Sequence, residues 1–374
     1  MMMILKNAVI FYQDKLQKLD IEVLDGKIAQ IGEDLKGKEE VDLTGLTVTP
    51  GLVDIHTHAC AGYDFCTATP EEMDKMCRFY ASHGVTAVAP AGMTLSEETL
   101  TGVFALIGEK MRAGTPGATI LGVNMEGPYL SPQKKGAHDA QYIVPPDANQ
   151  LRRLQKASGN AVAMVDISPC FEGAMDFIRE VSGEVVVSLA HTEADYDTAC
   201  KAIEAGASNV THLFNAMNPL HHRDPGLIGA AFDKDVTAEL ICDGIHIHPA
   251  VIRTAFCVLG KRAVLVSDSM SAAGMADGEY TLGGLEVIVR DGKATLRDGT
   301  IAGSTITLDK AVQNAISFGI APKDAIYAAT TAPARAVRQQ DTLGTIQVGR
   351  KADLAVFDNL WNIHSVYVGG QKFC

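Results

Sequence analysis

The chain of 374 residues carries a formal charge of −13, from 32 Lys and Arg against 45 Asp and Glu. This acidic balance argues against nucleic acid or an anionic membrane as the principal partner, so an anionic ligand would need a local basic cluster. The length suits one α/β barrel with a small appended domain, and a chain that is 47% hydrophobic can bury a large core.

The eight cysteines form no CxxC pair, and their spacing indicates neither a disulfide framework nor a thiolate zinc site. Residues 1–14 are typical of a strand, since they lack the basic start and apolar core of a signal peptide. No stretch is apolar for the roughly 20 residues that a membrane span requires. We therefore expect a cytoplasmic protein.

The two ends of the chain have a β pattern. Short apolar runs occupy residues 4–12, 20–31 and 40–48, with a turn at Asp25-Gly26, and two more occupy residues 353–357 and 365–368. Neither end can form a core alone, so we expect the two to pair with each other. The sequence predicts a small β-sandwich domain built from residues 1–50 and 347–374.

Residues 51–346 alternate between apolar strands and helices. Eight near-continuous apolar strands separated by helices predict a (β/α)8 TIM-type barrel. The strands are expected to end near Asp54, Ala91, Glu126, Ser168, His191, Leu213, Ile245 and Asp268. The clearest helical stretches are residues 71–83, 97–113, 174–181, 194–205, 249–259, 308–318 and 323–329. Residues 278–301 interrupt this alternation and are typical of a β-hairpin excursion.

Histidine and acidic residues recur where the predicted strands end. In a barrel of this type the carboxyl ends of all strands meet at one rim, the face that holds active sites. Residues far apart in the sequence should therefore share one pocket. The set comprises His56, His58, Glu126, His191, His212, His246 and Asp268.

His56 and His58 lie two apart in an extended segment, so both imidazoles can face one ion, although polar residues of an exposed loop would look the same. Glu126 precedes Gly-Pro and could simply mark a turn. His191 and His212 each terminate an apolar strand. Two imidazoles and one carboxylate are ligands of zinc or a similar divalent ion, and they leave a coordination position for water.

Asp268 could be the N-cap of a following helix. We favour a catalytic role, because a metal-bound water needs a base and the departing amide nitrogen needs a proton. In the loop after the sixth strand, the planar fork of Arg223 suits a phosphate. Lys134 and Lys135, in the loop after the third strand, are more typical of solvated charge.

Along essentially its whole length the chain resembles the N-acetylglucosamine-6-phosphate deacetylase family of the amidohydrolase superfamily. The HxH pattern is common to the superfamily, whereas the EGPYL, KKGAH and THLFNAM runs are specific to this family. The matching segments are PGLVDIHTH (50–58), NMEGPYLSPQKKGAH (124–138), LAHTEADYD (189–197), THLFNAMNPLHHRDPGLIGA (211–230), ICDGIHIHP (241–249) and LVSDSMSAAG (265–274).

The resemblance implies a barrel with a split β domain and the deacetylation of N-acetyl-D-glucosamine 6-phosphate. Glu126, His191 and His212 would hold the primary metal, and Asp268 would be the acid and base. His138 would polarise the acetyl carbonyl. The substrate site would be lined by Ala137, Asn215, Ala216, Arg223, His246, Ile301, Ala302 and Gly303.

Arg223 and His246 would contact the phosphate. Family members are usually homodimers, in which one subunit can lend such a contact to its neighbour. His56 and His58 match members that carry a second metal, so one or two ions per subunit are expected. Zinc is favoured, with iron, manganese and cobalt as alternatives, because imidazoles and a carboxylate accept all of them.

Three other functions compete with this interpretation. The galactosamine epimer of the substrate would permit the same chemistry. A cyclic amidohydrolase, such as a dihydroorotase or hydantoinase, commonly bridges two metals with a modified Lys on the fourth strand, but here that strand reads AVAMVDISP (161–169) without a Lys. An inactive barrel serving as a scaffold should have lost ligands that this chain keeps.

Overall fold

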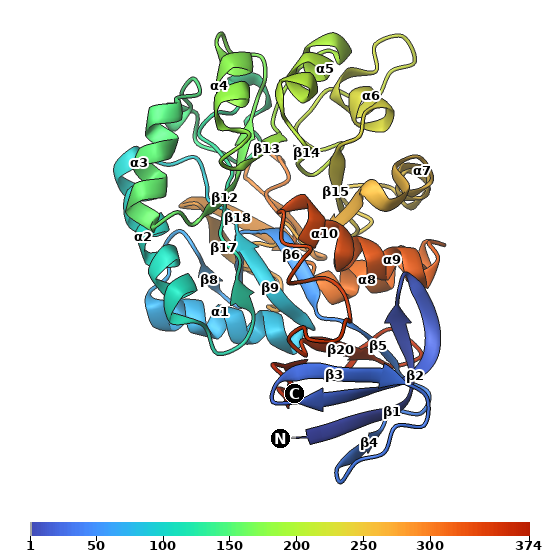
Figure 1. Cartoon of the computed structure of the whole chain (residues 1–374). Helices are drawn as coiled ribbons and strands as arrows, with labels where there is room; N and C mark the ends of the chain where they lie inside the picture. The colour runs from blue at the N-terminus through green and yellow to red at the C-terminus, as the bar shows by residue number, and fades with distance from the viewer. Residues whose placement is uncertain (1) are drawn as a thin grey trace.

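The computed structural model describes residues 2–374. A ring of helices surrounds a barrel of parallel strands, and a separate β-sheet packs at one end of the barrel, where both termini lie (Figure 1). The barrel strands are β6 (Leu52–Thr57), β9 (Val85–Pro90), β11 (Val123–Met125), β12 (Val162–Ile167), β13 (Val186–Leu189), β14 (Asn209–Val210), β15 (Thr237–Ile241) and β16 (Ala263–Val266).

The barrel closes through a few backbone contacts beyond its main sheet. The six strands β11 to β16 pair in parallel and in chain order, and β6 pairs with β9. A parallel bridge between Ala91 and Asn124 joins β9 to β11. The N–H of Asp268 donates to the carbonyl of His56 at 2.9 Å and so joins the end of β16 to β6. The predicted eight-stranded barrel is confirmed.

The seventh strand ends at Ile241, earlier than the predicted Ile245. The Asp243 side chain accepts the backbone N–H groups of Ile245 and His246 at 2.8 and 2.9 Å. This local turn competes with strand pairing, as Asp side chains often do. The apolar sequence pattern of the seventh strand therefore continues beyond Ile241, where its hydrogen bonds to the neighbouring strands end.

The helices of the outer ring agree with the prediction where strong caps mark them. The Thr69 hydroxyl and the Glu72 carboxylate form a capping box at the start of α1. Sequence analysis missed α3, α6 and α10; α6 contains Gly226 and Gly229 and α10 contains Pro333, residues that disfavour helix interiors. The helices are α1 (Pro70–Ser82), α2 (Glu97–Ala113), α3 (Ala148–Ser158), α4 (Ala174–Val181), α5 (Tyr196–Ala205), α6 (Gly226–Asp233), α7 (Pro249–Leu259), α8 (Leu308–Ser317), α9 (Pro322–Ala329) and α10 (Thr331–Ala336).

The two ends of the chain form one sheet around a shared apolar core. Its strands are β1 (Met2–Tyr12), β2 (Lys15–Leu24), β3 (Lys27–Gly32), β4 (Glu40–Asp42), β5 (Thr47–Pro50), β20 (Leu354–Phe357), β21 (Ile363–Val368) and β22 (Gln371–Lys372). Strand β20 runs antiparallel to β5, with Val356 opposite Val48, so the predicted pairing of the two ends is confirmed. The domain boundaries after residue 50 and before residue 347 stay a prediction.

Short elements decorate the rim of the barrel. Strands β7 (Ala59–Cys60) and β8 (Tyr63–Asp64) pair after β6, and β10 (Thr119–Ile120) pairs with β9. The predicted excursion is a three-stranded antiparallel sheet, one strand more than a hairpin: β17 (Gly278–Leu282), β18 (Leu285–Arg290) and β19 (Lys293–Thr295). None of the helices formed by residues 2–374 has the length and apolar character needed to cross a membrane.

The pairing of the two ends predicts a stability effect. Leu354 on β20 is fully buried in the β-domain core, whereas Leu360 is 67% exposed. We expect Leu354→Ala to lower the free energy of unfolding by about 2–5 kcal/mol, because it removes buried methyl groups and leaves a cavity. Leu360→Ala should change it by less than about 0.5 kcal/mol. Urea unfolding followed by circular dichroism measures both, and equal effects of the two substitutions would contradict the proposed shared core.

Candidate metal centre

The residues that sequence analysis placed at strand ends converge at the carboxyl rim of the barrel. Glu126 directly follows β11, His191 follows β13, and His212 follows β14. All three are buried, and one ligand atom of each lies within 4.8 Å of the others. His56, at the end of β6, forms a second such group with His58 and Asp268. The predicted convergence is therefore found.

Glu126 stands at the centre of the cluster. Its Oε1 lies 3.1 Å from His191 Nε2 and 3.0 Å from His212 Nε2. Its Oε2 lies 3.2 Å from His58 Nε2 and 3.3 Å from His138 Nε2. The Nε2 atom of His56 lies 3.6 Å from Oε1 as well. One carboxylate thus faces five imidazoles with its two oxygens, a geometry that suits a ligand shared by neighbouring ion sites.

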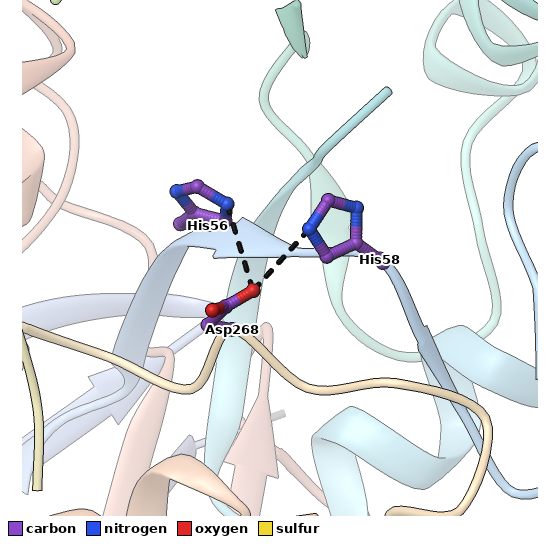
Figure 2. A group of neighbouring side chains, drawn as sticks. All are labelled: His56, His58 and Asp268. Atoms are coloured by element: carbon purple, nitrogen blue, oxygen red, sulfur yellow. Dashed lines mark ion pairs between the residues drawn. The ribbon is translucent and has the colours of Figure 1, made fainter. Parts of the chain in front are cut away.

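The second group consists of His56, His58 and Asp268, whose side chains point toward one another (Figure 2). The Oδ1 atom of Asp268 lies 3.7 Å from His56 Nε2 and 3.3 Å from His58 Nε2. His56 and His58 come from the first barrel strand and Asp268 from the end of the last, so the point where the barrel closes brings them together.

Hydrogen bonds on the far side of two imidazoles fix which nitrogen faces the cluster. The Nδ1 atom of His191 lies 2.7 Å from the Lys134 carbonyl, and Nδ1 of His56 lies 3.0 Å from Glu239 Oε2. Because these acceptors require an N–H, each Nδ1 carries a proton, and Nε2 is the nitrogen that each ring turns toward the cluster. In the neutral rings that a metal binds, the Nε2 lone pairs point at the oxygens of Glu126, and such acceptors repel each other unless a cation lies between them. The donor set therefore fits a divalent metal.

The backbone at the rim is held in an uncommon conformation. His191, His212 and Asp268 have φ values of 43°, 31° and 48°. Residues with a Cβ seldom adopt this left-handed region, and they do so where surrounding contacts fix them, often at functional sites. The N–H of Ser304 donates to the Asp268 carbonyl at 2.7 Å and supplies one such contact. The strand ends are thus bent so that these side chains turn toward the barrel axis.

Burial and neighbouring charge set the protonation of these groups. Burial lowers the pKa of His191 to about 4, which favours the neutral imidazole that a metal needs. Burial alone would raise the pKa of Glu126, but the imidazoles of His56 and His138 hold it well below its usual range. Burial alone would also raise the pKa of Asp268, but the hydrogen bond to His58 and the nearby imidazoles lower it below its usual value. Both carboxyl groups are therefore ionised at neutral pH.

A cavity of about 330 Å³ opens onto this cluster. Of the predicted substrate residues, six line it: Ala137, Asn215, Ala216, His246, Ile301 and Gly303. Ala302 is fully buried behind them in an apolar cluster. Arg223 is exposed, and its Nη1 lies 2.7 Å from His222 Nε2, so it stands outside the residues that line the cavity. Six of the eight predicted substrate residues thus line this cavity, whereas Arg223, which was predicted to contact the phosphate, does not.

Two imidazoles in the cavity wall are held by other groups. The backbone N–H of Thr94 donates to Nδ1 of His138 at 3.2 Å, so Nε2 is the ring nitrogen that carries a proton toward the cavity. The Nδ1 atom of His246 lies 2.6 Å from Asp243 Oδ2. Burial tends to lower the pKa of His246, but Asp243 raises it above its usual value. His246 is thus biased toward the cation at the edge of the cavity.

Sequence analysis missed the supporting groups. Glu239 on β15 is fully buried; it accepts from His56, from Asn209 Nδ2 at 2.8 Å and from the backbone N–H of His212 at 3.2 Å. Acidic residues inside otherwise apolar strands were the available signal for Glu239 and also for Asp54 and Asp166. The Lys134 carbonyl that holds His191 had no signal, because any residue supplies a carbonyl.

Comparisons with known proteins agree with this geometry. The model of the amidohydrolase family matches residues 47–372. The chain belongs to the amidohydrolase family. This amidohydrolase is 35% identical over 354 residues to an N-acetylgalactosamine-6-phosphate deacetylase of Escherichia coli O157:H7, an alignment covering 94% of this chain and 93% of that one. It is also 35% identical to the N-acetylglucosamine-6-phosphate deacetylase of Vibrio furnissii, covering 93% of this chain and 88% of that one.

The solved structures give the same result. A variant of the N-acetyl-D-glucosamine-6-phosphate deacetylase of Mycobacterium smegmatis, in complex with N-acetyl-D-glucosamine 6-phosphate, superposes with a TM-score of 0.95 at 32% identity. The alignment covers 100% of this chain and 99% of that chain. The family and the two groups of His and acidic residues together indicate a divalent metal in this amidohydrolase.

The role of Glu239 leads to a prediction for metal binding. We expect Glu239→Gln to weaken metal binding about 10- to 100-fold, because an amide polarises the His56 imidazole less than a carboxylate does. Glu98→Gln on the exposed face of α2 is the matched control and should leave the affinity unchanged. Competition with a chromophoric chelator measures both constants. Equal affinities for the Glu239 variant and the control would show that Glu239 does not support the ligands.

Proposed function

We propose that this amidohydrolase removes the acetyl group of N-acetyl-D-glucosamine 6-phosphate and releases acetate and D-glucosamine 6-phosphate. The observation that supports this most strongly is the convergence of Glu126, His191 and His212 beside Asp268 in one cavity. The full-length similarity to deacetylases of this substrate supports the choice of reaction.

The proposed mechanism assigns a role to each group around the cavity. A divalent cation held by Glu126, His191 and His212 would lower the pKa of a coordinated water and polarise the acetyl carbonyl. The Asp268 carboxylate, ionised before reaction, accepts the proton of the attacking water and then delivers it to the departing amine. The Nε2–H of His138 donates to the oxygen on which negative charge develops.

The sugar phosphate has to be held at the mouth of the cavity. His246, biased toward the cation by Asp243, is the proposed phosphate contact within the same chain. Because Arg223 is exposed and lies outside the cavity wall, we propose that it reaches the cavity of a neighbouring subunit in a homodimer. Zinc is the favoured metal, with iron, manganese and cobalt as alternatives. The cytoplasmic location stays a prediction.

Deacetylation of the galactosamine epimer is the second candidate. The similarity to the E. coli N-acetylgalactosamine-6-phosphate deacetylase over 94% of the chain favours it directly. The two substrates differ only in the orientation of one hydroxyl, and the same metal and Asp268 would serve both. The complete ligand set and the intact proton relay argue against an inactive scaffold.

An acetate-release assay tests the function. We expect metal-loaded protein to release acetate from N-acetyl-D-glucosamine 6-phosphate with a kcat/KM at least tenfold above that for the galactosamine epimer. The unphosphorylated sugar is the control and should react poorly, because it lacks the group that His246 would contact. Preference for the galactosamine epimer would select the second candidate, and no acetate from either phosphate would refute both.

Asp268 provides a test of the mechanism. We expect Asp268→Asn to lower kcat roughly 10²- to 10⁴-fold, because the amide can neither accept nor deliver a proton. The metal bound by Glu126, His191 and His212 should stay, and elemental analysis of the purified variant checks this. A variant with near-normal kcat would remove Asp268 from the proton relay.

A further inference from the structure

One buried carboxylate near the metal ligands has no assigned partner. Asp166 lies on β12, the fourth barrel strand, and its side chain is fully buried. Neither of its oxygens has a hydrogen-bond partner among the described residues. The neighbouring Thr211 hydroxyl forms a hydrogen bond of 2.6 Å with the Ser188 hydroxyl. A buried carboxylate without donors is rare, because it loses its hydration without compensation.

The position of Asp166 suggests what compensates it. One of its oxygens, one nitrogen of His56 and one oxygen of Glu126 all lie within 4.8 Å of one another. The Nδ1–H of His56 is occupied by Glu239, so the nitrogen free to face Asp166 and Glu126 is Nε2, which has no hydrogen-bond partner. Three electron-pair donors therefore face one point inside the barrel.

Charge balance leads to the same conclusion. Glu126, Asp166, Glu239 and Asp268 are 3%, 0%, 0% and 7% exposed. Within residues 2–374, no Lys or Arg side chain is buried beside them or elsewhere. One divalent cation at the Glu126, His191 and His212 group would leave part of this buried negative charge unbalanced. A second divalent cation beside Asp166 would reduce the remainder.

A proton on Asp166 would serve less well. It would neutralise Asp166 alone and would leave the Nε2 atom of His56 without a partner. A cation, in contrast, uses the lone pairs of Asp166, His56 and Glu126 together. Two carboxylates and one imidazole suit zinc and the divalent first-row transition metals.

We propose that Asp166 is a ligand of a second divalent cation, held jointly with His56 and Glu126. The inference rests on the metal centre of the proposed function, and Glu126 is then shared between the two ions. It adds a ligand from the fourth barrel strand, where sequence analysis noted only that no Lys is present.

Metal binding by Asp166→Asn tests the proposal. The wild type, this variant and Asp54→Asn are stripped with a chelator, dialysed against excess Zn²⁺ and desalted, and zinc per chain is then measured by elemental analysis and by calorimetric titration. Asp54→Asn is the matched control. Asp54, on β6, is also fully buried and has one oxygen without a partner, while its other oxygen accepts from the backbone N–H groups of His56 and Ser267. Among the described residues it belongs to no candidate cation group.

The expected result is that Asp166→Asn loses one zinc equivalent, or binds its weaker equivalent at least tenfold less tightly, while Asp54→Asn resembles the wild type. Because zinc binds the folded chain, the rise in Tm on adding Zn²⁺ should also be smaller in Asp166→Asn and in Asp166→Ala. The alanine variant keeps the test valid if asparagine prevents folding.

Unchanged zinc stoichiometry and affinity in Asp166→Asn would overturn the proposal, as would equal losses in the Asp54 control. The readout is metal content and not acetate release. A protein that binds two zinc ions through Asp166 but deacetylates neither sugar would therefore refute the proposed function alone, and an active deacetylase with unaltered zinc in Asp166→Asn would refute this inference alone.

Discussion

Electrostatic repulsion between the nitrogen and oxygen ligand atoms is the constraint on which the site at the carboxyl rim of the barrel depends. The Nε2 atoms of His191 and His212 lie 3.1 and 3.0 Å from the same oxygen of Glu126 and 3.0 Å from each other. All three groups are buried, so the crowding of these donors is relieved only from the side of the cavity onto which they open. A cation turns the repulsion into attraction, and the hydrogen bonds to Glu239 and to the Lys134 carbonyl hold two of the imidazoles in the orientation that a cation needs. The free energy of metal binding therefore offsets the burial of these charges.

Much of the architecture could be predicted because it follows from local periodicity. The eight apolar strands were predicted, the seventh with too late an end, and the helices α2, α4 and α7 have the predicted positions, since each depends on its own residues. The convergence of His56, Glu126 and Asp268 could be predicted as well, because barrel topology brings all strand ends to one rim. The helices α6 and α10 could not be predicted, because their glycine and proline residues have low helix propensity and tertiary packing stabilises them instead.

The parts of the site that escaped prediction depend on contacts between distant segments. No sequence pattern near Lys134 predicts that its carbonyl accepts a hydrogen bond from His191. None near Thr94 predicts that its N–H donates to His138. The exposed position of Arg223 depends on how its loop folds against His222. Residue type and spacing identify which groups can ligate or catalyse, whereas the groups that orient them appear only when the strands are assembled.

The connection from the sheet of the chain ends into the first barrel strand is a single residue long. Gly51 separates β5 from β6; its N–H donates to Asp353 in the β domain, and the next N–H, that of Leu52, donates to Gly84 in the barrel. A Cβ at Gly51 would lie 2.0 Å from the Thr86 hydroxyl oxygen, so the backbone passes here with no spare room. Such a connection cannot serve as a hinge, since any rotation there would displace His56 five residues later. Ligand entry must accordingly depend on the loops of the opposite rim, while the β domain acts as a fixed foundation for the first ligand strand.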